Sequence, residues 1–181
     1  MDRFFVLTGG PGSGKSTLLA ALGKAGFAAM PEAGRSVIRQ EVAAGGSALP
    51  WADRAAFADR MLDIDMRSHA EATALDGIVL FDRGIPDIIG YRDLCGLPRP
   101  ARLMDAARRL RYNRAVFIAP PWPESYARDA ERKQDWDEAV ATHDAMVRVY
   151  GELGYTLIRL PLAPVEERVA FVRERIGLND R

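Results

Sequence analysis

The chain has 181 residues, of which 48% are hydrophobic and 28% are charged. This length suits one α/β domain, and this composition is that of a globular protein, which excludes a disordered or fibrous one. The 25 basic and 25 acidic side chains cancel, so no overall positive field attracts nucleic acid or an anionic membrane, and we expect no nucleic-acid partner.

The cysteine content and the N-terminal sequence predict a cytoplasmic protein. Cys95 is the only cysteine, so it has no partner for an internal disulfide. The N-terminus passes directly into a strand pattern, without the apolar core of a signal peptide, and no apolar run is long enough to span a membrane.

Short apolar runs alternate with segments of helical length along the whole chain. The first run, Arg3 to Thr8, is almost continuously apolar, as in a strand buried on both faces of a parallel sheet. The predicted strands are 3–8, 27–30, 77–81, 114–119 and 155–160, and the predicted helices are 15–25, 33–44, 51–73, 124–132, 134–151 and 165–176. Strands joined by helical crossovers predict an α/β three-layer sandwich, in which a five-stranded, mainly parallel sheet carries helices on both faces.

A phosphate-binding motif follows the first strand. It matches G-x-x-x-x-G-K-[ST] and is followed by a threonine; its residues are Gly9, Gly10, Pro11, Gly12, Ser13, Gly14, Lys15, Ser16 and Thr17. The glycines let backbone N–H groups surround phosphates, and the next helix adds the positive end of its dipole. Lys15 supplies a positive charge, and the Ser16 hydroxyl is a ligand for Mg²⁺. The motif predicts bound ATP with Mg²⁺; GTP is less favoured because no N/T-K-x-D guanine motif is present.

Polar side chains follow two other predicted strands. Asp82 directly follows the apolar run G-I-V-L-F, the pattern of a Walker B strand. It would hold Mg²⁺ or accept a proton from an attacking hydroxyl; alternatively, it caps a helix from Gly84 to Tyr91.

Glu32 follows the second strand, and Arg35 lies one helical turn later. The two side chains would bracket a substrate, unless Glu32 only stabilises the first turn of its helix. Arg83 would hold substrate or phosphate, or form a surface ion pair of little energetic value. Glu32, Arg35 and Arg83 are therefore the candidate substrate-binding residues, and Ser16 and Asp82 are the candidate metal ligands.

An arginine-rich segment follows the fourth strand. Pro120 to Pro123 ends that strand, and Arg128 and Arg132 lie four residues apart, on one face of a helix. We expect a lid at about 120–135 whose arginines stabilise charge on the γ-phosphate and exclude water. The alternative is a solvated helix with alternating charges.

Several segments together resemble the AAA-type ATPase family related to nicotinamide-riboside kinase domains. These are the phosphate-binding loop, P-E-A-G-R, F-D-R-G-I-P-D, F-I-A-P-P-W, Y-A-R-D-A-E-R and the closing G-Y-T-L-I-R-L-P-L-A-P-V-E-E-R-V-A-F-V. The resemblance covers nearly the whole chain. It implies one P-loop kinase-like domain over residues 1–181, of the nucleoside- and nucleotide-kinase type. It further implies Asp82 as the Walker B acid, Arg128 and Arg132 as lid residues, and a carboxylate such as Glu32 as base for the acceptor hydroxyl.

The leading functional hypothesis is a phosphotransferase that moves the γ-phosphoryl group of ATP to a small, hydroxylated, nucleoside-like acceptor. Lys15, Asp82, Glu32, Arg128 and Arg132 are its candidate catalytic residues, with the choice of base between Glu32 and Asp82 left open. The main alternative is an ATPase or a nucleotide-switched binding module with a protein or lipid partner and no small-molecule acceptor. A GTP-binding switch ranks last.

Overall fold

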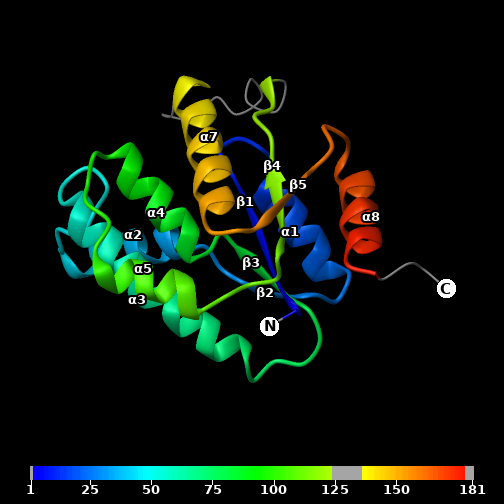
Figure 1. Cartoon of the computed structure of the whole chain (residues 1–181), viewed down its shortest axis with the longest axis horizontal. Coiled ribbons are helices and arrows are strands. Elements are labelled where there is room, and N and C mark those ends of the chain that lie inside the picture. The colour runs from blue at the N-terminus through cyan, green and yellow to red at the C-terminus, as the bar shows by residue number, and fades with distance from the viewer. Residues whose placement is uncertain (1, 124–135, 178–181) are drawn as a thin grey trace.

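The structure, a computed structural model, describes residues 2–123 and 136–177 (Figure 1). Its strands are β1 (Phe4–Gly9), β2 (Ala28–Met30), β3 (Val79–Asp82), β4 (Ala115–Ala119) and β5 (Thr156–Arg159). They form one sheet in the order β2-β3-β1-β4-β5, and every neighbouring pair is parallel. The predicted five-stranded parallel sheet is confirmed.

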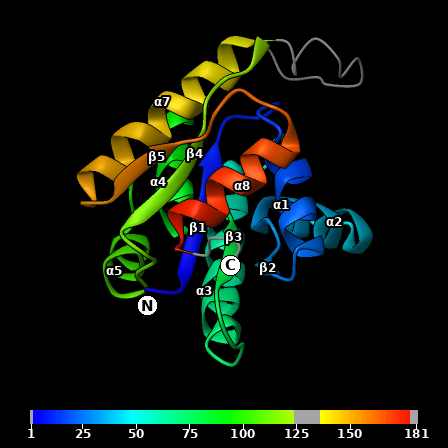
Figure 2. The same ribbon diagram turned by 90° about the vertical axis from the view of Figure 1, so that its right-hand side faces the viewer.

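Helices cover both faces of this sheet. They are α1 (Lys15–Lys24), α2 (Ala33–Ala44), α3 (Arg54–Ala72), α4 (Ile85–Leu94), α5 (Ala101–Arg109), α7 (Trp136–Glu152) and α8 (Val165–Arg175). Figures 1 and 2 show α1 and α8 together on one side of the sheet, with α4, α5 and α7 on the other. Within the described ranges, no helix is both long and apolar enough to cross a membrane.

The side chains of β1 show why both faces must be covered. Phe5 and Leu7 pack against α1 and α8, whereas Phe4 and Val6 pack in a second cluster that includes Tyr150 of α7. Alternate residues of a strand point to opposite faces, and all four of these side chains are buried. The continuous apolar run is therefore the signature of a central strand between two helical layers.

One described helix, α5, lies outside the predicted set. It buries only Leu103, Ala106 and Ala107. Its three arginines, and the two prolines just before it, make this segment resemble a loop in sequence. The strand predicted at 77–81 begins and ends slightly later in the structure, so that Asp82 is its last residue. The helix predicted at 124–132 lies outside the described residues.

The strand order brings three functional segments to one edge of the sheet. β3 lies between β2 and β1, and Leu7 of β1 is level with Asp82 of β3. The phosphate-binding loop after β1, Glu32 after β2 and Asp82 at the end of β3 therefore meet at the carboxyl edge. Ligands of open α/β sheets bind at this edge, where the connections diverge to opposite faces.

The start of the phosphate-binding loop packs tightly against neighbouring backbone. A methyl group on Gly9 would lie 2.4 Å from the Ala119 carbonyl oxygen, and one on Gly10 would lie 2.3 Å from the Ala139 carbonyl oxygen. Gly9 also has a φ of 130°, which other residues rarely adopt. The loop is thus seated against the end of β4 and the first turn of α7.

We predict that Gly10→Ala lowers the free energy of unfolding by about 1 to 3 kcal/mol, because backbone must move to admit the methyl group. The matched control is Gly23→Ala in α1, where no atom lies within 4 Å of the added carbon. That change should be neutral or stabilising by up to about 1 kcal/mol, since alanine favours helix. Urea denaturation of both variants tests the pair; equal stabilities would contradict the close seating of the loop.

Candidate active site

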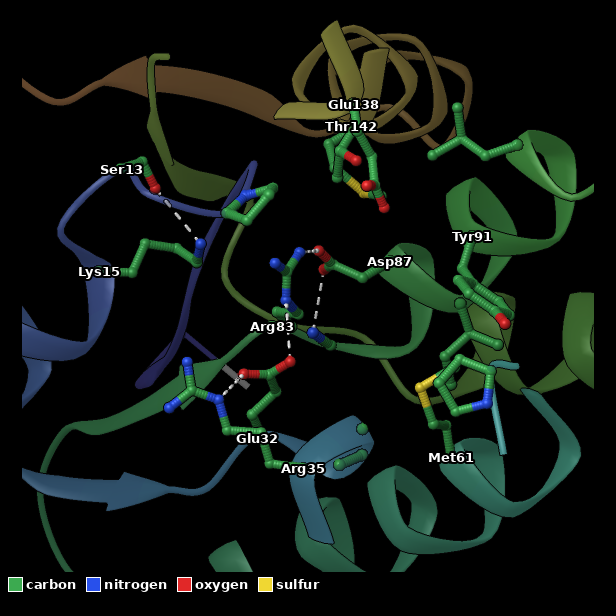
Figure 3. A pocket seen from close by; sticks show the side chains of 18 of the residues that line it. Ser13, Lys15, Glu32, Arg35, Met61, Arg83, Asp87, Tyr91, Glu138 and Thr142 are labelled. Carbon is green, nitrogen blue, oxygen red and sulfur yellow. Dashed lines mark hydrogen bonds and ion pairs between the residues drawn. The ribbon is translucent and has the colours of Figure 1, made fainter. Parts of the chain in front are cut away.

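The phosphate-binding loop runs from β1 into α1, and Lys15 lies at its centre. Gly14 has a left-handed conformation and precedes the first helical residue. The Lys15 side chain is nearly buried, and Nζ donates to the carbonyl oxygens of Gly9 at 3.1 Å and Gly10 at 2.8 Å and to Ser13 Oγ at 3.3 Å (Figure 3). Burial, and then the charge of Arg83, lower the pKa of Lys15 to about 7. An anion bound in the loop would raise this pKa again, because a nearby negative charge favours the ammonium form.

Arg83 connects two carboxylates on the wall beside the loop. Its Nε lies 3.5 Å from Glu32 Oε1, and its Nη1 lies 3.1 Å from Asp87 Oδ1. Glu32 also pairs with Arg35 Nε at 3.1 Å, so Figure 3 shows Glu32 held between two guanidinium groups. The Arg83 side chain is only 20% exposed. This burial differs from the surface ion pair that was the alternative for Arg83.

The backbone of Arg83 is unusual as well. Its φ of 68° is the only positive value at a non-glycine residue within the described ranges. A left-handed conformation at a residue with a long side chain is costly and persists where surrounding contacts impose it. Here the turn from β3 into α4 delivers the guanidinium to Glu32 and Asp87.

Asp87, which the sequence analysis quoted in a motif without assigning it a role, is the most highly bonded carboxylate of the site. Oδ1 accepts from Thr8 Oγ1 at 2.5 Å, while Oδ2 accepts from the Tyr150 hydroxyl at 2.6 Å and the Gly84 N–H at 3.0 Å. With Arg83, these donors saturate the carboxylate and join β1, α4 and α7. The sequence signal available was an acidic residue in the first turn of a helix, where a cap is favoured.

Asp82 lies behind the loop, at the end of β3. Its Oδ1 is buried and has no hydrogen-bond partner among the described residues. Burial, and then the charge of Glu32, raise the pKa of Asp82, while Lys15 and Arg83 act in the opposite direction. Asp82 does not cap α4: the residue before that helix is Gly84, and its N–H is bonded to Asp87.

The donor set beside the loop fits Mg²⁺. No group of three histidine, cysteine or acidic residues suited to a metal occurs among residues 2–123 and 136–177. Mg²⁺ differs from the metals that need such a group, since it is held by one or two protein oxygens together with phosphates and water. The unpartnered oxygen of Asp82 and the hydroxyl of Ser16, the second residue of α1, would supply that number of ligands.

Arg168 supports the loop from α8, and the sequence analysis missed it. The side chain is 2% exposed, and Nη1 donates to the Ser13 carbonyl oxygen at 3.0 Å. A methyl group on Gly14 would lie 2.7 Å from the same nitrogen. Nothing in the sequence marks this residue, because it follows two glutamates in a segment that looks like an exposed charged helix.

A cavity of about 890 Å³ continues from the loop between α2, α3, α4 and α7. Ile38, Phe57, Met61, Ile88 and Tyr91 form its apolar wall, and Glu32, Arg35 and Arg83 line the end nearest Lys15. This volume is in the range of small-molecule sites. Glu32 lines the cavity, whereas Asp82 does not.

The structure thus brings most of the predicted site residues together. Residues 11–17 of the loop line the cavity with Glu32, Arg35 and Arg83. Gly9 and Gly10 accept hydrogen bonds from Lys15 at the base of the loop. The charge of Asp82 acts on Lys15 and raises its pKa. Arg128 and Arg132 lie outside the described residues.

Comparison with solved structures shows the same fold. NadR protein in complex with NR matches with a TM-score of 0.71 and 17% identity, over 99% of this chain and 53% of that chain. NadR protein in complex with NAD and AMP-PNP matches with a TM-score of 0.70 and 16% identity, over 99% and 51%. Deoxyadenosine kinase from M.mycoides with bound products matches with a TM-score of 0.66 and 14% identity, over 96% and 98%. The chain therefore spans about half the length of the NadR chains and nearly all of the deoxyadenosine kinase.

No curated protein matches the sequence. A family model described as "AAA domain" matches residues 4–168, from the start of β1 to the arginine that supports the loop. The chain belongs to this AAA-domain family and has the P-loop fold that NadR protein and deoxyadenosine kinase share.

Proposed function

We propose that this protein is a kinase that transfers the γ-phosphoryl group of ATP to a hydroxyl group of a small, nucleoside-like acceptor. The observation that carries the proposal is the continuity of the phosphate-binding loop with a cavity of about 890 Å³, with Glu32 and Arg83 at their junction. A protein that only hydrolyses ATP needs space for a water molecule there. A partly apolar cavity of this size suits an organic acceptor.

The nucleotide end of the site consists of the loop, Lys15, Ser16 and Asp82. Backbone N–H groups and the Lys15 ammonium would bind the phosphates, and Ser16 and Asp82 would hold Mg²⁺, which when bound neutralises charge on phosphate oxygens. Structures of NadR protein with AMP-PNP and of deoxyadenosine kinase with dATP support ATP as the nucleotide. In the same proposal, Arg128 and Arg132 close the site as lid residues.

The acceptor end favours Glu32 over Asp82 as the base. Glu32 lines the cavity and would face an acceptor hydroxyl bound there, whereas Asp82 does not line the cavity. Arg35 and Arg83 fix the orientation of the Glu32 carboxylate. Arg83 would also contact the transferred group, where its charge stabilises the transition state.

The structural neighbours suggest which acceptors to test first. One NadR structure holds NR, and another neighbour is a deoxyadenosine kinase. Nicotinamide riboside and purine nucleosides are therefore the first candidates. A reducing, cytoplasmic setting is part of the proposal, supported by the unpaired Cys95.

We predict that one nucleoside of a panel containing nicotinamide riboside, adenosine and deoxyadenosine raises ADP release from Mg-ATP at least tenfold. A phosphorylated product should appear in equal amount, as measured by coupled assay and mass spectrometry. Lys15→Ala is the blank. ADP release that ignores every acceptor yet requires Lys15 would instead identify an ATPase, the activity that the AAA-domain family suggests.

Glu32→Gln and Asp82→Asn should fail in different ways. Removing a general base lowers kcat by about 10²- to 10⁴-fold, so we expect this loss in Glu32→Gln with an unchanged Mg²⁺ requirement. Asp82→Asn should raise the Mg²⁺ concentration for half-maximal rate at least tenfold. A Mg²⁺ titration of kcat separates the two roles; the reverse pattern would exchange them.

The lowered pKa of Lys15 predicts proton uptake on nucleotide binding. Above pH 7 the Lys15 amine of the nucleotide-free protein is largely neutral. Because the nucleotide phosphates favour the ammonium form of Lys15, nucleotide binding must add a proton. The Kd for Mg-ADP should rise with pH between 7 and 9, by up to about tenfold per unit. Calorimetry in buffers of different ionisation enthalpy measures the uptake. Lys15→Arg is the control, because guanidinium stays charged; equal pH dependence in both proteins would refute this origin.

A further inference from the structure

One face of α3 forms the side of the cavity away from the phosphate-binding loop. Arg54, Phe57, Met61 and Asp65 follow one another at intervals of three or four residues and all line the cavity. Side chains with this spacing lie in one row along a helix. The Phe57 ring meets the ring of Tyr91 from α4 edge-on, with centroids 5.5 Å apart. An acceptor in the cavity would therefore contact this row.

Asp65 is the one buried polar residue of this row, since Phe57 and Met61 are apolar and Arg54 is exposed. The Asp65 side chain is 6% exposed, and it lines the cavity. Within the described ranges its carboxylate takes part in no hydrogen bond and no ion pair. Buried carboxylates without partners are rare because losing hydration is costly. Asp87, by contrast, is saturated by three donors and Arg83.

The surrounding charges do not compensate Asp65. Burial is the main cause that raises its pKa well above the ordinary value, and the charges of Asp87, Glu32 and Asp82 act in the same direction. Arg83 opposes them, but its guanidinium is already paired with Glu32 and Asp87. Whether ionised or protonated, the carboxyl group keeps an oxygen that can accept a hydrogen bond. What the position lacks is a donor.

We propose that Asp65 is a specificity residue that accepts a hydrogen bond from an N–H or O–H group of the acceptor. The inference rests on the proposed function and deepens it by naming a property of the substrate. A nucleoside with an amino, amide or hydroxyl donor at this position binds, and an analogue that lacks the donor binds more weakly. The difference is large because the analogue leaves a buried polar group unpaired.

Matched acceptor pairs test this assignment on the full-length protein with Mg-ADP bound. Adenosine and purine riboside differ in the 6-amino group, nicotinamide riboside and nicotinic acid riboside differ in amide against carboxylate, and adenosine and 2′-deoxyadenosine differ in one sugar hydroxyl. We expect the wild type to prefer the donor-bearing member of at least one pair by about 10- to 100-fold in Kd, the effect of leaving one buried polar group unpaired. The pair that shows it identifies the donor as base or sugar.

Asp65→Ala and Asp65→Leu, which remove the accepting oxygen, should reduce that preference to within about threefold while Mg-ADP binding, which does not involve α3, stays unchanged. Asp63→Asn is the control, since Asp63 lies on the same helix but is 40% exposed and pairs with Arg102 at 2.6 Å; its preference should equal that of the wild type. An undiminished preference in both Asp65 variants overturns the role of Asp65 and leaves the kinase proposal standing. If the wild type binds Mg-ADP but none of these nucleosides, both proposals fail.

Discussion

The Arg83 guanidinium, held between Glu32 and Asp87, is the interaction on which the site depends. Each carboxylate belongs to a different segment, since Glu32 precedes α2 and Asp87 lies in the first turn of α4. The contacts at 3.5 and 3.1 Å therefore tie two walls of the cavity to the end of β3. Burying a charge is favourable only when partners replace its hydration, and removing one partner of a buried pair leaves the other uncompensated. The left-handed backbone of Arg83 is maintained by these contacts.

Asp87 extends the same constraint into the core. Thr8 at the end of β1 and Tyr150 of α7 both donate to it, and both donors are fully buried. The phosphate-binding loop begins one residue after Thr8, so the orientation of Arg83 and the start of the loop share one hydrogen-bond network. Networks of this kind are worth more together than their separate bonds. A substitution at Tyr150, which is distant from the loop in sequence, would therefore affect the loop through Asp87.

The site is built around charges that are incompletely balanced without an anion. Burial, and then the charge of Arg83, lower the pKa of Lys15, while the charges of Asp82 and Glu32 raise it by less. Phosphates placed in the loop add negative charge where the protein has concentrated buried cations, so their binding relieves the cost of that arrangement. This is a physical reason for the lysine to be buried.

Local patterns predicted the sheet and the loop, because a buried parallel strand and a phosphate-binding motif are written in consecutive residues. Asp82, Glu32 and Arg83 were recognisable from their positions at strand ends, where the topology gathers side chains. Asp87, Asp65 and Arg168 were not, since their environments come from segments far apart in the chain. Asp65 looks like one more acidic residue on a helix that also carries Asp59 and Asp63, and only the packing of α3 against α4 shows that it is buried. For α5, a narrow apolar stripe among arginines concealed a real helix.

The two ends of the cavity are held in different ways. The loop is fixed by backbone contacts with β4 and α7 that admit no side chain at Gly9 or Gly10, so the nucleotide end tolerates little change. The row on α3 faces the opposite side and is held by side-chain packing, which accommodates substitution at moderate cost. Substitutions at Phe57, Met61 or Asp65 can therefore alter the acceptor without disturbing Lys15 or Arg83. In the proposed kinase, acceptor specificity and phosphoryl transfer would thus be carried by different elements of the same cavity.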